Sequence, residues 1–297
     1  MKILFGEKNK KKDVTNICMK KLLFNNKILI PSGAVEKIKL FKLPINKYNN
    51  HKKITLINNE RELVLSNDYD IIIDLLTNKV NIVDGNYLDQ KLSCIHFNLK
   101  FLFGDIKHEL PEQLMSVRYL KGNEKVLEIG GNLGRNSLVI SSILTDDKNL
   151  VVLESNKIIA NKLIKNRNIN NHNFYIEPSA LSKKKLIQKG WDTIPSDTLK
   201  PGFVFIDTIM YEELQSKYKI IFDTLVLDCE GAFYYILRDM PEILNNINLI
   251  IMENDYHNIE HKKYVDDILI KNNFVIDYKL AGGWGPCKDF FFEVWKK

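Results

Sequence analysis

The chain has 297 residues, 45% of them hydrophobic, a size that can bury a large core as one domain or as a domain with an appendage. It has no apolar run of about eighteen residues and no apolar N-terminal signal, which predicts a cytoplasmic protein without a membrane span. The formal net charge is +6, but the lysines do not alternate with aromatic residues, so nucleic acid is an unlikely partner.

Residues 1–107 are predicted to be a small β-rich region of unknown role. Short apolar runs alternate there with Asn-, Gly- and Lys-rich turns, which is typical of antiparallel strands. The predicted strands are Ile28–Ile30, Lys37–Leu43, Ile54–Ile57, Glu62–Leu65, Asp70–Leu76, Val80–Val83 and Ile95–Phe103. We place the domain boundary after residue 107, because Glu109–Leu120 has apolar residues at helical spacing and a proline near its start.

Residues 108–297 form the second predicted domain, and its first strand leads into a glycine-rich turn. Val126–Ile129 reads as the buried strand, and a helix is predicted from Arg135. Glu154 ends the second strand, about 20 residues beyond the turn, where a doubly wound fold places the carboxylate that binds ribose hydroxyls. The turn glycines, which let the backbone approach a ligand closely, are Gly130, Gly131 and Gly134.

The turn differs from both common phosphate-binding loops. In a dinucleotide fingerprint the second glycine lets the backbone reach the pyrophosphate, and Asn132 takes that place here. A P-loop needs Gly-Lys-Ser/Thr, which Gly134-Arg135-Asn136 does not supply. S-adenosylmethionine carries an adenosine, a sulfonium and an amino acid but no phosphate. We therefore predict it as the cofactor, with Glu128 and Glu154 as acidic partners.

Strands and helices then alternate in the βαβ manner, which predicts an α/β, Rossmann-like sheet of seven strands. The strands are Lys125–Ile129, Asn149–Glu154, Asn173–Ile176, Thr224–Asp228, Leu249–Glu253, Phe274–Leu280 and Phe290–Trp295. The last two flank a Gly282–Pro286 turn and read as a hairpin that adds an antiparallel edge strand, as methyltransferase folds do. Residues 182–222 are too long for a simple connection and are either a substrate-shaping lid or a structural excursion.

Acidic residues follow two neighbouring strands of this predicted sheet. Asp228 and Glu230 lie at the carboxyl end of the fourth strand, where open α/β sheets bind their ligands. Glu253, Asp255 and His257 follow the fifth strand onto the same rim. We expect Asp255 to cap the following helix and assign functional roles to Asp228 and Glu230.

Together these motifs resemble the FkbM family of S-adenosylmethionine-dependent methyltransferases. The family pattern of acid-x-Gly-Ala-Asn-x-Gly, a strand ending in Glu, and Lys-x-Asp-x-Glu-Gly-Ala is similar to residues 128–134, Glu154 and residues 226–232. The resemblance covers roughly residues 108–297. Val226 stands where the family has a lysine, and Phe233 stands where an acid often follows. Any catalytic role that the family assigns to that lysine or that acid therefore has no residue to perform it in this chain.

The resemblance implies methyl transfer to a hydroxyl oxygen, commonly of a sugar or a glycosylated small molecule. The candidate bases for the hydroxyl proton are Asp228, Glu230 and His257. A divalent cation shared by the acids is a less favoured alternative, and we assign no metal ligands. In this arrangement the turn lines the methionine moiety and Glu154 holds the ribose. The cofactor residues are then Glu128, Gly130, Gly131, Asn132, Gly134, Glu154, Ser155, Asn156, Ala180 and Leu181.

Two alternatives and one open question remain at this point. An RNA 2′-O-methyltransferase fits the basic pI and Asp228, but such enzymes end the fifth strand in a lysine where this chain has Glu253. A non-catalytic protein that binds a glycan or another partner and merely retains the fold is the second alternative. The intact glycines and Glu154 argue against it. Whether the chain forms a homo-oligomer is left open.

Overall fold

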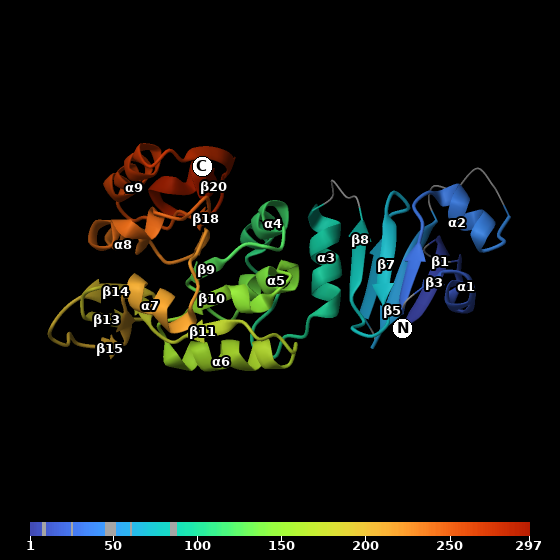
Figure 1. The fold of residues 1–297 in the computed structure, drawn as a ribbon, viewed down its shortest axis with the longest axis horizontal. Coiled ribbons are helices and arrows are strands. Elements are labelled where there is room, and N and C mark those ends of the chain that lie inside the picture. Colours follow the sequence, from blue (N-terminus) through green and yellow to red (C-terminus); the bar gives the residue numbers. More distant parts are fainter. Residues whose placement is uncertain (8–9, 25, 45–51, 60, 84–87) are drawn as a thin grey trace. The chain divides into compact units, whose positions relative to one another are not determined.

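The computed structural model describes residues 1–7, 10–24, 26–44, 52–59, 61–83 and 88–297. The chain divides into two compact units, Met1–Leu99 and Lys100–Lys297 (Figure 1). This division lies before the predicted boundary at residue 107, because the intervening segment is bound to the second unit. The backbone N–H groups of Leu102 and Phe103 both donate to the side-chain oxygen of Asn166, at 2.8 and 3.2 Å.

The first unit contains two four-stranded antiparallel sheets, with strand orders β2-β1-β5-β6 and β3-β4-β7-β8. The strands in chain order are Lys2–Glu7, Lys10–Asp13, Leu23–Phe24, Lys27–Ile30, Lys53–Asn58, Arg61–Leu65, Asp70–Asp74 and Val80–Val83. The β-rich character predicted for this region is confirmed. The three strands before residue 27 were not predicted.

Two predicted strands, at residues 37–43 and 95–103, are wrong, because each segment begins inside a helix. Residues 37–43 lie largely in α2 (Ala34–Leu40), and residues 95–103 begin inside α3 (Leu88–Asn98). The alternating sequence of α2 resembles a strand, but the residues that it buries, Ala34, Lys37, Ile38 and Phe41, follow helical spacing. A further helix, α1 (Thr15–Lys21), was not predicted.

The second unit is built on a seven-stranded sheet of order β11-β10-β9-β17-β18-β20-β19. In this order the strands are Tyr175–Glu177, Leu150–Leu153, Val126–Ile129, Thr224–Leu227, Leu249–Glu253, Phe292–Lys296 and Val275–Leu280. All are parallel except β20, which pairs antiparallel with both β18 and β19. This is the predicted Rossmann-like methyltransferase fold with an antiparallel last strand. That strand lies inside the sheet, however, and the edge is β19 instead.

Six α-helices accompany this sheet in the second unit (Figure 1). They are α4 (Leu110–Tyr119), α5 (Arg135–Ile143), α6 (Lys157–Asn168), α7 (Tyr211–Tyr218), α8 (Phe233–Asp239) and α9 (Ile259–Lys271). Helix α4 packs against α5, and α8 against α9. Every residue of β9, β10 and β17 is buried, so the centre of the sheet is the core of this unit. Among the described residues, no helix is both long and apolar enough to cross a membrane.

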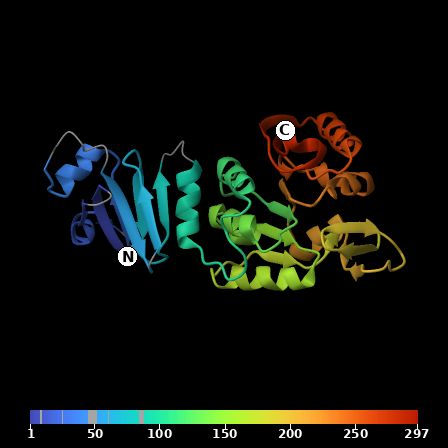
Figure 2. The ribbon, with the colours of Figure 1, turned by 180° about the vertical axis from the view of Figure 1, so that it is seen from behind.

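The long connection between residues 182 and 222 folds into a small sheet of its own, at one end of the second unit in Figures 1 and 2. Strands β13 (Leu186–Lys189), β14 (Asp192–Pro195) and β15 (Val204–Ile206) form it in the antiparallel order β14-β13-β15. A short parallel pair, β12 (Ala180–Leu181) with β16 (Thr208–Ile209), joins the end of the connection to the segment that precedes it. The connection is therefore a folded insert rather than an irregular loop.

Candidate functional site

The glycine turn after β9 lies directly against the chain that leaves β17. Gly130 adopts a φ of 95°, and a β-carbon built on it would stand 1.5 Å from the carbonyl oxygen of Asp228. The N–H groups of Gly130 and Gly131 donate to the carbonyl of Leu153 at 3.1 and 2.9 Å. The turn is thus fixed between β10 and β17, and only glycine fits at residue 130.

Gly131 and Gly134 are required by close packing around the turn. A β-carbon on Gly131 would lie 2.2 Å from the side chain of Val152, and one on Gly134 would lie 2.2 Å from that of Leu163 on α6. Gly134 also has a φ of 87° where it precedes α5. Neither glycine lines the large cavity described below.

Glu154 holds the turn through two charge-assisted hydrogen bonds. Its carboxylate accepts from the backbone N–H of Asn132 at 2.9 Å and from that of Asn156 at 2.8 Å. Asn132 has a φ of 44°, a left-handed conformation that asparagine tolerates better than most residues. Burial raises the pKa of Glu154, and the two amide hydrogen bonds counteract that shift. One carboxylate therefore links the turn to the start of α6.

A cavity of about 690 Å³ opens beside this turn, at the carboxyl ends of the central strands. It lies where the strand order reverses between β9 and β17, the usual ligand position of open α/β sheets. Apolar side chains of Ile159, Leu181 and Leu186 form one part of its wall. The predicted site residues that line it are Gly130, Asn132, Glu154, Ser155, Asn156, Ala180, Leu181, Asp228 and Glu230.

Ser155 and Asn156 are held by local hydrogen bonds on the wall of this cavity. The Ser155 hydroxyl donates to the side-chain oxygen of Gln188 on β13 at 3.2 Å, so the folded insert contributes to the cavity. The side chain of Asn156 accepts from the N–H groups of Ile158 and Ile159 and caps α6. The side chain of Asn156 therefore acts mainly on the helix.

The charge of the cavity wall is strongly one-sided. Six carboxyl groups line it, and none of the described residues that line it is a lysine or an arginine. The acids are Glu109, Glu112, Glu154, Asp228, Glu230 and Glu253. Glu109 and Glu112 were not predicted as site residues from the sequence, because acids at the N-terminus of a helix usually only interact favourably with the helix dipole. The burial of Glu112 follows from the packing of α4 against β18, which no local sequence pattern reports, and Glu109 pairs with Arg135.

Glu128 lies outside the large cavity, beneath the turn. Its side chain is only 3% exposed and lines a small cavity of about 10 Å³ that adjoins the large one, with Ser137 of α5 beside it. Burial raises the pKa of Glu128 to about 8. Val226 is its partner residue on β17, at the position where the FkbM pattern has a lysine. The chain thus keeps the buried acid without a cationic neighbour on that strand.

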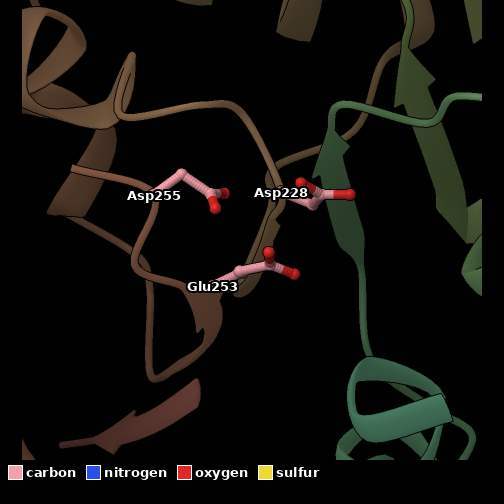
Figure 3. A group of neighbouring side chains, drawn as sticks. All are labelled: Asp228, Glu253 and Asp255. Carbon is pink, nitrogen blue, oxygen red and sulfur yellow. The ribbon is translucent and has the colours of Figure 1, made fainter. Parts of the chain in front are cut away.

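Three carboxyl groups converge between the ends of β17 and β18. One oxygen each of Asp228, Glu253 and Asp255 lies within 4.8 Å of the others, and Figure 3 shows Glu253 and Asp255 directed toward Asp228. Burial and mutual repulsion raise the pKa of Asp228 well above its usual range and those of Glu253 and Asp255 to about 9. We refer to these residues as the acid trio. The expected capping role of Asp255 is wrong, because Asn258 caps α9.

A second cavity of about 310 Å³ adjoins the first, since Glu230, Trp191 and Tyr235 line both. His257 lines only this smaller cavity, and its ring lies 4.5 Å from that of Trp284. Burial raises the pKa of Glu230, and the nearby His257 counteracts the shift. The three predicted bases are therefore divided. Asp228 faces the large cavity, His257 the small one, and Glu230 both.

Comparisons with known proteins give distant structural similarities and nothing more. No family model matches the chain, and no curated protein gives a significant match. The structure is similar to a ribosomal protein L11 methylase from Lactobacillus delbrueckii subsp. bulgaricus, with 12% identity and a TM-score of 0.42 over 67% of this chain and 83% of the other. It is also similar to an O-methyltransferase from Bacillus cereus in complex with SAH, with 14% identity and a TM-score of 0.42 over 72% and 92% of the two chains. Similarity at this level transfers neither activity nor substrate to this protein.

Proposed function

We propose that the second unit is an S-adenosylmethionine-dependent methyltransferase that acts on a hydroxyl oxygen. The main support is the cavity of about 690 Å³ at the strand-order reversal, with its six carboxyl groups and no lysine or arginine among the described residues of its wall. A sulfonium with an ammonium suits such a wall, and the described part of the wall offers the phosphates of a dinucleotide no lysine or arginine as a partner. The cavity size is in the range of small-molecule and cofactor sites.

The residues of the wall match the parts of this cofactor. Glu154 uses one lone pair on each oxygen for the turn amides and keeps others for ribose hydroxyls. Ile159, Leu181 and Leu186 offer an apolar surface to the adenine, next to Ala180. We assign the methionine moiety to Gly130 and Asn132, which also line the cavity, while Glu128, Gly131 and Gly134 support the turn.

The acceptor we propose is a sugar or a glycan, bound in the adjoining cavity of about 310 Å³. Aromatic rings that present flat faces together with hydrogen-bonding groups suit the two sides of a sugar ring. The side chains of this kind that line the cavity are Trp191, Tyr235, Tyr256, His257 and His261. The folded insert supplies Trp191, so we assign it the role of shaping the acceptor site.

For methyl transfer, the protein must position the acceptor hydroxyl against the cofactor and remove the hydroxyl proton. When bound, S-adenosylmethionine supplies a methyl group whose bond to sulfur breaks, with its electron pair left on the sulfur, as the acceptor oxygen forms the new bond. The acceptor proton passes to a base. Glu230 is the candidate best placed for this, because its side chain lines both cavities, and His257 beside it is positioned to relay the proton outward.

Calorimetric titration of the full chain with three ligands tests the cofactor assignment. We expect S-adenosylmethionine and S-adenosylhomocysteine to bind, and NAD⁺, which carries adenosine on a pyrophosphate, to give no heat. Binding of NAD⁺ without S-adenosylmethionine would overturn the proposal. Transfer of a labelled methyl group to a panel of glycans then separates an enzyme from a binding protein. RNA in the same assay tests the alternative acceptor.

A further inference from the structure

We propose that the acid trio, Asp228, Glu253 and Asp255, binds one divalent cation of the hard class, such as Mg²⁺, Mn²⁺ or Ca²⁺. The three oxygens that lie within 4.8 Å of one another fit this directly. Oxygen ligands stand roughly 2.0 to 2.6 Å from such ions, so two ligands of one ion are separated by up to about twice that distance. The trio spans this separation without any change of backbone.

A fourth carboxyl group, on a different element, lies next to the trio. Glu112 of α4 lies beside Glu253 and is only 6% exposed, and its Oε2 atom has no hydrogen-bond partner. The Oδ2 atom of Asp255, on a side chain that is 3% exposed, likewise has none. A buried carboxylate oxygen without a partner is costly. A cation bound by the trio would provide a partner for Asp255 and a countercharge beside Glu112.

Two other buried acids of the second unit are neutralised by lysines, and the trio is not. Glu293 is fully buried and pairs with Lys262 at 2.9 Å, and Glu177 pairs with Lys217 at 2.6 Å. The charged side chains that act most strongly on the trio are themselves all acidic: Glu109, Glu112 and Glu230 in addition to its own members. A cation from solution would provide the missing countercharge.

The position of the trio suggests what the ion would do, a step that rests on the proposed function. Asp228 and Glu253 line the large cavity, and Asp255 lines the small one. An ion held between them would lie where the two cavities meet. A metal ion that binds the acceptor hydroxyl lowers its pKa and orients its oxygen. The all-oxygen ligand set favours Mg²⁺, Mn²⁺ or Ca²⁺ over Zn²⁺, which prefers nitrogen and sulfur.

Mn²⁺ binding to the full chain, followed by electron paramagnetic resonance, tests this site without any assay of activity. We expect one ion per chain, with affinity lowered at least tenfold in Asp255→Asn and in Glu253→Gln. Glu154→Gln, which removes an acid from the same cavity outside the trio, should leave the affinity unchanged. A wild-type chain that binds no Mn²⁺ at millimolar concentration, or variants that bind it as well as wild type, would overturn the proposal.

Two further measurements keep the outcomes distinct. If the variants unfold, the melting temperature of the wild-type chain is measured with and without Mn²⁺ instead. Mn²⁺ should raise this temperature, and an unchanged melting temperature would count against the site. Displacement of Mn²⁺ by S-adenosylmethionine, one for one, would assign the trio to the cofactor ammonium and overturn the metal site. A chain that binds Mn²⁺ but does not bind S-adenosylmethionine would refute the proposed function alone. A chain that binds S-adenosylmethionine but not Mn²⁺ would refute the metal site alone.

Discussion

The backbone of Gly130 passes so close to the carbonyl of Asp228 that a β-carbon would stand 1.5 Å from its oxygen. This contact joins the two motifs on which the site depends, the turn after β9 and the acids after β17. We expect Gly130→Ala to force the two loops apart, to cost about 3 kcal/mol or more of stability and to abolish cofactor binding. Chemical denaturation and calorimetry measure the two effects.

Gly190→Ala is the matched control for that variant. Gly190 also has a positive φ, of 59°, but no atom lies within 4 Å of the position its β-carbon would take. Only backbone strain remains, so we expect a loss of about 1 kcal/mol. Equal losses of stability in the two variants would show that the contact with Asp228 is not what makes Gly130 necessary.

Glu154→Gln is expected to weaken the binding of S-adenosylmethionine roughly 10- to 100-fold. An amide can accept only one of the two hydrogen bonds from Asn132 and Asn156, and the loss of one charge-assisted bond costs about 1.5 to 3 kcal/mol. Glu177→Gln serves as the control, because that acid is buried on the neighbouring strand β11 but does not line the cavity. It should lower stability and leave affinity intact. Unchanged affinity in Glu154→Gln would refute the role given to this carboxylate.

The parts of the fold that are local in sequence could be predicted from it. The seven strands of the second unit are short apolar runs between clear turn signals, and the glycine turn with Glu154 has a fixed spacing. The prediction failed at α2, where Lys and apolar residues alternate as in a strand, yet Ala34, Lys37, Ile38 and Phe41 are buried together on one helical face. Packing against the sheets of the first unit decides that case, and periodicity over so short a segment does not.

The site was predictable only as far as its backbone motifs. That Asp228 and Glu253 share one rim follows from the parallel sheet, but the approach of Asp255 depends on the path of the chain after β18. The involvement of Glu112 depends on how α4 packs, which no local pattern reports. Gly131 and Gly134 were predicted to contact the cofactor, whereas neighbouring side chains of Val152 and Leu163 are what require glycine there.

The buried Glu128 should make the stability of the protein depend on pH. Burial raises its pKa in the folded state from 4.5 to about 8. Between these values the folded state holds a proton that the unfolded state has released, so stability falls as the pH rises, by up to about 1.4 kcal/mol per pH unit. Glu128→Gln removes this loss, and its stability relative to wild type should increase from pH 5 to pH 8 in urea titrations. Glu260→Gln, at an exposed position, should show no such trend, and a pH-independent difference for Glu128→Gln would contradict the assignment.

Glu230→Gln tests the choice among the three candidate bases. Glu230 lines both cavities, so loss of its carboxylate should lower the rate of methyl transfer by roughly 100-fold or more, the usual contribution of a general base. Affinity for S-adenosylmethionine should change little, because we assign cofactor binding to Glu154 and the turn. His257→Ala should have a smaller effect, since that side chain lines only the acceptor cavity, whereas Asp228→Asn should reduce both turnover and Mn²⁺ affinity. A Glu230→Gln enzyme with wild-type turnover would transfer the role of base to Asp228 or His257, and the pH profile of the remaining activity would show which of the two carries it.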